Sequence, residues 1–166
     1  MSAQEVEQAL RRLVGLPLWG TTRAADMECF KFGAKHTGLG YFGKPSTVGD
    51  YALHLQCAWR IVGPMGIVVG GHDVYAPEGD ARAHLPGFDW DQPGSTRRDE
   101  RLTAFFAGLK EPLIVEEVLA DSVGGFVIKL TGGFSLEAFP SGTVSEAEHW
   151  RLFKPGARGH FVITAD

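Results

Sequence analysis

The chain has 166 residues, of which 16 are Lys or Arg and 20 are Asp or Glu, so its formal net charge is −4. This acidic balance, with no long basic run, argues against nucleic acid as the main partner. No apolar run reaches the ~18–20 residues that span a bilayer, and the N-terminus lacks the pattern of a secretory signal. We therefore expect one cytoplasmic domain over 1–166 with no membrane partner, and the sequence leaves its oligomeric state open.

Two helices are predicted. Ser2 and Glu5 form a Ser-x-x-Glu capping box ahead of apolar residues spaced for one helix face, and Gly15 ends that pattern. A second helix is predicted from Arg98 to Leu109, because Asp99 lies in its first turn, where the helix dipole favours an acid. Four apolar side chains share one face of this second segment.

The rest of the chain is predicted to form mainly short strands, because 22 Gly and 9 Pro divide it into apolar segments. The longest is Tyr51–Val62, where apolar and polar residues alternate throughout. Three later runs joined by Gly-rich links form a meander: Leu113–Ala120, Phe126–Leu130 and Phe134–Phe139. Further strands are expected around 67–69, 149–153 and 160–164. The predicted fold class is α+β, mainly antiparallel β with two helices.

Two parts of the sequence, about 1–75 and 97–166, resemble each other in the order of their elements. Each has a helix, a Gly/Pro break, several strands, a Trp-Arg strand and a last strand. Trp59-Arg60 corresponds to Trp150-Arg151, and Glu137 stands where the first copy has His54. We interpret this as an internal duplication of a helix-plus-meander unit; the alternative is a chance recurrence of a common arrangement. The two Trp are expected in the core, with each Arg on the opposite face, paired with a carboxylate or an aromatic ring.

A candidate ligand site lies on the polar face of the predicted Tyr51–Val62 strand. His54, Gln56 and Arg60 are spaced to point the same way. An imidazole, an amide and a guanidinium on one sheet face could bind an anion or a carboxylate, because Arg offers a planar fork of donors. The alternative is an ordinary solvated sheet face.

A Gly-rich segment imitates a phosphate-binding loop. Gly38 to Gly43 spells G-x-G-x-x-G, and Lys44 extends it to G-x-x-x-x-G-K. Pro45, however, occupies the place of the magnesium-binding hydroxyl, and a strand rather than a helix follows. We interpret the segment as a hairpin loop, in which Tyr41 and Phe42 either pack onto the core or form part of a binding lip.

Catalytic and metal-binding patterns are not found in the sequence. His72-Asp73 is a close pair of potential ligands among the six histidines, but no H-x-x-x-H, H-E-x-x-H or C-x-x-C occurs. No G-x-S-x-G elbow is present. Cys57 is expected to be an inert core thiol and Cys29 is ambiguous. We therefore assign no catalytic residue, metal or cofactor, and the sequence leans against an enzyme without deciding the question.

A candidate partner-binding site lies in the long loop over 76–96, which is rich in Pro, Gly and Asp. Loops of this length in a compact domain are often functional. Phe88 and Trp90, if exposed, are natural anchors for a protein partner.

Two segments resemble small uncharacterised bacterial proteins: Leu53-His-Leu-Gln-Cys-Ala-Trp-Arg-Ile61, and Glu148-His-Trp-Arg-Leu152 near the C-terminus. Some proteins of that build are immunity-like partners of bacterial toxins, so the resemblance implies a binding role, without a residue assignment or an enzymatic motif. We expect a cytoplasmic bacterial binding or interaction protein. The alternative is a small-molecule-binding protein or enzyme with an anion pocket at His54, Gln56 and Arg60.

Overall fold

The computed structural model describes residues 1–40, 43–79 and 86–165. These residues form two α-helices and twelve strands, which confirms the α+β, mainly antiparallel class. The helices are α1 (Ala3–Leu10), extended by a 3₁₀ turn η1 (Arg11–Leu13), and α2 (Arg97–Gly108). The capping box at Ser2 and Glu5 is present as expected. Tyr41 and Phe42, the residues of the expected binding lip, lie outside the described residues, and so does His84.

Ten strands form one antiparallel sheet in the order β12-β11-β5-β2-β1-β8-β9-β10-β6-β7. Their bounds are β1 (Pro17–Ala24), β2 (Met27–Phe32), β5 (Tyr51–Leu55), β6 (Ala58–Gly63), β7 (Gly66–Gly70), β8 (Leu113–Ala120), β9 (Phe126–Leu130), β10 (Phe134–Phe139), β11 (Glu148–Phe153) and β12 (Phe161–Thr164). The two remaining strands, β3 (His36–Leu39) and β4 (Pro45–Val48), form a separate hairpin, as expected for the Gly-rich segment.

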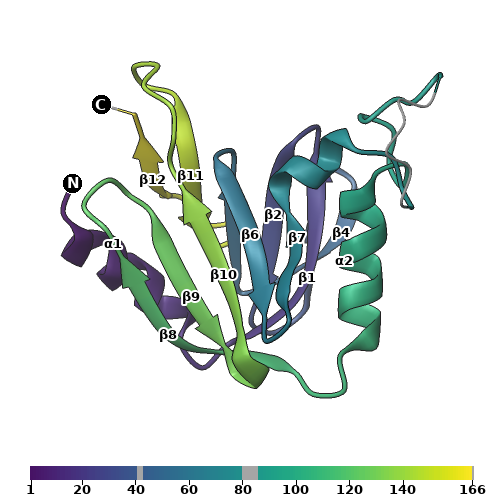
Figure 1. Cartoon of the computed structure of the whole chain (residues 1–166). Helices are drawn as coiled ribbons and strands as arrows, with labels where there is room; N and C mark the ends of the chain where they lie inside the picture. Colours follow the sequence, from purple (N-terminus) through teal and green to yellow (C-terminus); the bar gives the residue numbers. More distant parts are fainter. Residues whose placement is uncertain (41–42, 80–85, 166) are drawn as a thin grey trace.

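The sheet has two five-stranded halves, β12-β11-β5-β2-β1 and β8-β9-β10-β6-β7. Among the described strands, backbone pairing joins the halves where β1 pairs with β8, through Pro17–Ile114 and Leu18–Leu113. Side chains of the two halves meet across a common core. Trp59 on β6 and Phe30 on β2 have ring centroids 5.1 Å apart, although four strands separate β6 from β2 in the sheet order, and Trp150 on β11 lies 5.2 Å from Phe126 on β9. Figure 1 shows α1 beside β8 on one side of the molecule and α2 beside β7 on the other.

Each half contains strands from both ends of the chain. The chain forms β1, β2 and β5 in one half and then crosses to form β6 and β7 in the other; later it forms β8, β9 and β10 and crosses back to form β11 and β12. The cross-strand pairs match: Arg60 faces Glu137, and Arg151 faces His54. This correspondence supports the internal duplication, which stays a prediction.

The prediction of one continuous strand over Tyr51–Val62 was wrong. β5 ends at Leu55 and β6 begins at Ala58 in the opposite half. At the crossing, the amides of Gln56 and Cys57 both donate to the carbonyl of His149, at 2.8 and 3.1 Å. Two strands in different halves share the same period of two, so alternation alone did not distinguish them from one strand.

The two tryptophans of the Trp-Arg strands are core anchors, as predicted. Trp59 and Trp150 retain 5% and 0% of their surface exposure. The indole Nε1 of Trp150 donates to the carbonyl of Gly124 at 2.7 Å, so its one polar atom is satisfied inside the core. By contrast, the buried Nε1 of half-buried Trp19 has no hydrogen-bond partner among the described atoms.

We predict that Trp150→Phe lowers the free energy of unfolding by about 1–3 kcal/mol, because it leaves a buried carbonyl without its donor. Trp19→Phe is the matched control, since it removes an indole N–H that has no partner, and we expect a change within about 0.5 kcal/mol. Urea denaturation monitored by circular dichroism measures both. Equal losses in the two variants would contradict this account of the core.

Candidate functional site

The structure does not bring His54, Gln56 and Arg60 together on one face. His54 lies on β5 opposite Arg151, and the Arg151 guanidinium forms an ion pair with Glu148. The side chain of Gln56 also hydrogen-bonds Glu148. Arg60 lies in the other half, where its Nε donates to Glu137 at 2.7 Å. Both arginines are therefore paired with carboxylates, as predicted, but the three-residue anion site depended on a continuous strand and does not form.

Gln56 lines a surface hollow of about 290 Å³ at the end of the sheet where β5 crosses to β6. We call it the Tyr75 hollow. Its other walls come from the β1–β2 turn, the start of β6 and the 3₁₀ turn η3 (Gly71–Tyr75) after β7. They are Asp26, Cys57, Ala58, Trp59, Gly70, Gly71, His72 and Tyr75. Burial raises the pKa of the Cys57 thiol to about 11, so this thiol is neutral.

Three aromatic rings form a continuous surface beside this hollow. Tyr75 lies edge-on to His72 at 5.5 Å and to Trp90 at 5.1 Å between ring centroids. We call these three residues the aromatic platform. The Tyr75 hydroxyl donates to the carboxylate of Asp26 at 2.6 Å, and this hydrogen bond raises the pKa of the phenol, which stays protonated. Tyr75 is 45% exposed, so the platform is open to a partner.

The predicted partner-binding residues lie in the segment that carries this platform. Trp90 is half-buried against Tyr75, and Phe88 is also half-buried. Neither is the fully exposed anchor that the sequence suggested. The sequence singled out Trp90 as a candidate anchor if exposed, but it gave no indication that Tyr75 lies beside it and that His72 lies beside Tyr75.

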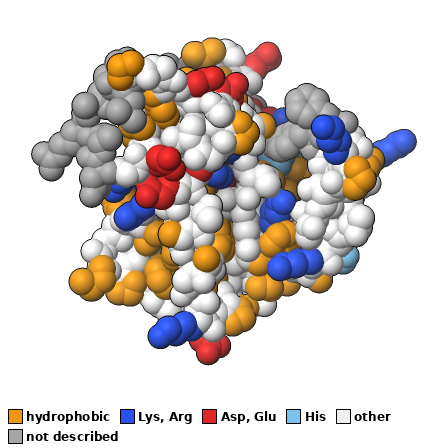
Figure 2. Space-filling view, turned by 90° about the vertical axis from the view of Figure 1, so that its right-hand side faces the viewer, with side chains coloured by type: hydrophobic (Ala, Val, Ile, Leu, Met, Phe, Trp, Pro, Cys, Tyr) orange, Lys and Arg blue, Asp and Glu red, His pale blue; other side chains and the backbone are white. Residues whose placement is uncertain are grey.

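The exposed charge around the platform is mostly negative over the part of the chain that the structure describes. The exposed carboxylates are those of Asp26, Glu78, Asp89, Asp91 and Glu100. The guanidinium groups of Arg23 and Arg98 are buried, with 7% and 8% of each side chain exposed, whereas Arg97 is half-buried and Arg101 is exposed on α2. On the face shown in Figure 2, acidic side chains gather in the upper part, whereas Lys and Arg lie mainly lower and to the right.

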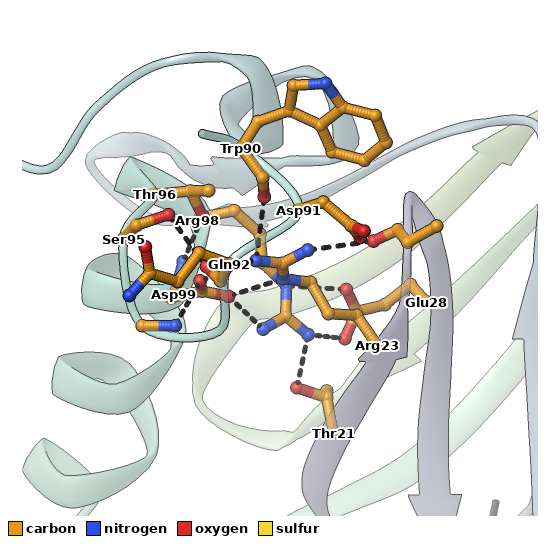
Figure 3. A network of polar contacts seen from close by, with 12 residues as sticks. Thr21, Arg23, Glu28, Trp90, Asp91, Gln92, Ser95, Thr96, Arg98 and Asp99 are labelled. Carbon is orange, nitrogen blue, oxygen red and sulfur yellow. Dashed lines mark hydrogen bonds and ion pairs between the residues drawn. The ribbon is translucent and has the colours of Figure 1, made fainter. Parts of the chain in front are cut away.

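Arg23, on β1, holds the backbone of the platform loop, residues 86–96. Its guanidinium donates to the carbonyls of Trp90 and Gln92 at 2.9 and 3.0 Å and to the carboxylate of Asp99 at 2.9 Å. The Asp99 carboxylate also accepts from the amide of Gly94 at 2.9 Å. Figure 3 shows the guanidinium groups beneath the loop, with the Trp90 ring pointing away from them.

A second buried arginine joins α2 to the sheet. Arg98 makes a two-pronged ion pair with Glu28 on β2, and it also donates to Asp99 and to the hydroxyl of Thr21. Burial raises the pKa of Glu28 to about 7, against the opposing effect of Arg98. Burial also opposes ionisation of Asp99, but the hydrogen bonds from Arg23 and Arg98 outweigh it and hold the pKa of Asp99 at about 2.

This network fixes the loop at a high desolvation cost. Buried charges are tolerated only when pairing and hydrogen bonding satisfy them, and an apolar replacement of similar volume is often as stable. The hydrogen bonds of the network join the platform loop to β1 and to the first turn of α2.

Sequence reasoning missed Arg23, Glu28 and Arg98, which build this network. The sequence did contain one indication of a buried carboxylate. Glu28 is two residues from Phe30 and four from Phe32, so on a strand all three side chains point to the same, apolar face. A buried carboxylate needs a partner, but the sequence alone does not show which arginine supplies it.

Comparisons with protein-family models, curated proteins and solved structures find no match to this chain. The resemblance to small bacterial proteins therefore stays a prediction. Within the described residues, no three His, Cys, Asp or Glu side chains gather in a way that could hold a metal ion. No helix in these same ranges is long and apolar enough to cross a membrane.

We predict that Arg98→Met lowers the free energy of unfolding by about 3–5 kcal/mol at pH 8, because it leaves the Glu28 carboxylate buried and unpaired. Without the guanidinium the pKa of Glu28 in the folded variant rises further, because burial is then unopposed. Folded Glu28 therefore keeps its proton at pH values where Glu28 in the unfolded chain has already lost it. Rising pH therefore destabilises the variant more than the wild type, and the loss at pH 5 is smaller than at pH 8.

Chemical denaturation at both pH values measures the difference. The double variant Glu28→Met with Arg98→Met is the control, and we expect it to recover most of the lost stability because no buried charge remains. A loss in Arg98→Met that is independent of pH would show that Glu28 is not the group left uncompensated.

Proposed function

We propose that this chain is a protein-binding module whose aromatic platform and Tyr75 hollow receive a basic segment of a partner protein. The observation that carries the proposal is the buried Arg23 and Arg98 network, which holds the platform loop in one conformation. Rigid aromatic residues at a surface are typical binding hot spots. The surrounding exposed carboxylates favour a partner of opposite charge.

The chemistry of the site suits arginine or lysine side chains. A guanidinium can stack on the rings of Tyr75 and Trp90, where the π-face attracts a cation. Asp26 borders the hollow and is exposed, so it can accept charge-assisted hydrogen bonds from a side chain that enters there. The amide of Gln56 offers a further acceptor on the same wall.

An immunity-like role, in which this protein masks a basic surface of another protein in the bacterial cytoplasm, fits this proposal. The anion-binding alternative is less favoured, because Arg60 is paired with Glu137 and Arg151 with Glu148. An anion at either guanidinium would have to displace a carboxylate that is already in place.

The test uses a short peptide of alternating arginine and glycine, with a glutamate–glycine peptide as the opposite-charge probe. We expect the basic peptide to shift the NMR resonances of the Trp90 indole and of the Gly70 and Gly71 amides, with an affinity that falls as salt rises. Asp26→Asn and Tyr75→Ala should each weaken binding at least about tenfold.

Glu116→Gln is the matched control, because Glu116 is an exposed carboxylate on β8 outside the Tyr75 hollow. We expect it to bind like the wild type. The proposal fails if this control weakens binding as much as Asp26→Asn does, or if the acidic peptide binds as well as the basic one.

A further inference from the structure

A second cavity lies under the β3–β4 hairpin, on the face of the sheet opposite the core. Its volume is about 250 Å³. Its floor is formed by β1, β2, β5 and β11, through Thr22, Cys29, Lys31, Ala52, His54 and Phe153. Its roof is formed by the hairpin, through Leu39, Gly40, Ser46, Val48 and Gly49. Figure 2 shows this side of the molecule, with hydrophobic side chains between basic ones to the right of centre.

The roof exists in only one of the two halves that the structure describes. The connection from β2 to β5 carries the β3–β4 hairpin, whereas the corresponding connection from β9 to β10 is the three-residue turn η4 (Thr131–Gly133). The side chains beneath differ in the same sense. His54 occupies the position that Glu137 occupies in the other half, where Glu137 is paired with Arg60. The cavity thus combines an added roof with a replaced floor residue.

Specific contacts hold the hairpin over the floor. The Lys31 ammonium donates to the carbonyl of Thr47 at 2.9 Å. At the base, Asp50 accepts from the amide of Ala34 at 2.7 Å and contacts His36 at 2.6 Å. Gly49 lies so close to the backbone of β2 that an added Cβ would be 2.3 Å from the carbonyl oxygen of Phe32. These contacts set the height of the roof.

One charged group lines the cavity, the Lys31 ammonium, and no carboxylate is found among the described residues that line it. Burial lowers the pKa of His54 to about 4, assisted by the nearby Arg151, so the imidazole is neutral. Burial also raises the pKa of the Cys29 thiol to about 11. Cys29 and His54 face each other across β2 and β5, but the thiolate needed for nucleophilic attack is not formed. The geometry therefore suits binding rather than cysteine chemistry.

We propose that this cavity binds a small, uncharged, mainly apolar molecule of about one or two rings, oriented by the His54 imidazole. An apolar cavity of about 150 Å³ is enough to hold benzene, so this volume admits a substituted ring or a bicyclic molecule. A cationic ligand is disfavoured, because it would meet the Lys31 ammonium and no carboxylate is available among the described lining residues to balance its charge. This site is separate from the aromatic platform and does not depend on the protein-binding proposal.

The test uses indole and 4-methylphenol as neutral probes and benzylammonium as the positively charged probe of similar size. Isothermal titration calorimetry should give a Kd below about 1 mM for at least one neutral probe, within the range that small ligands reach per atom. Benzylammonium should bind at least about tenfold more weakly, because the Lys31 ammonium lines the cavity. The bound probe should also raise the thermal midpoint of unfolding.

Two variants fill the cavity from opposite walls. Ala52→Leu fills it from the floor and Ser46→Leu from the roof, and each should weaken binding of the neutral probe at least about tenfold. Ser46 is half-buried on a hairpin outside the main sheet, so this variant keeps the test valid if Ala52→Leu does not fold. Asp26→Asn at the Tyr75 hollow should bind the neutral probe like the wild type.

The proposal is overturned if neither neutral probe binds. It is likewise overturned if benzylammonium binds as tightly as the neutral probes, or if the folded Leu variants bind like the wild type. None of these results bears on the peptide test at the platform, so the two proposals succeed or fail separately.

Discussion

Two guanidinium groups with almost no access to solvent hold the platform loop and the start of α2 on the sheet. Arg98 ties the start of α2 to Glu28 on the sheet, and Arg23 ties the platform loop to Asp99 in the first turn of α2. The two arginines share one partner, because the Asp99 carboxylate accepts hydrogen bonds from both guanidinium groups. The loop, the helix and two strands therefore form one charged unit, and removing a member leaves a buried charge uncompensated.

The sheet explains why such a unit is possible. The last two strands of each half come from the other part of the chain, so neither half is complete without the crossing at Gln56 and Cys57 or its later counterpart before β11. The two core tryptophans lie on these exchanged strands and contact phenylalanines of the opposite half. The two candidate sites lie at the periphery of this interlocked sheet: the segment between β7 and α2 carries the platform loop, and the β3–β4 hairpin covers the cavity.

Local features of the fold could be predicted from the sequence. The capping box at Ser2, both helices and the meander over 113–139 depend on short-range spacing, which the structure confirms. The crossing after Leu55 could not be predicted, because two half-buried strands on either side of it continue the same alternation. The charged network could not be predicted either, because Arg98 and Glu28 lie 70 residues apart and only the folded sheet brings them together. The sequence proposed His54 and Trp90 as candidate site residues, but it could not predict their neighbours, since Arg151 and Tyr75 come from other elements.

The central claim is that Arg23 keeps the platform loop ordered, and hydrogen–deuterium exchange of Arg23→Gln tests it most directly. The account predicts that the amides of residues 86–96 exchange at least about tenfold faster in this variant, while the amides of β8, β9 and β10 keep their wild-type protection. Unchanged protection of the loop in a folded Arg23→Gln variant would contradict the claim, because the loop would then be ordered without the guanidinium.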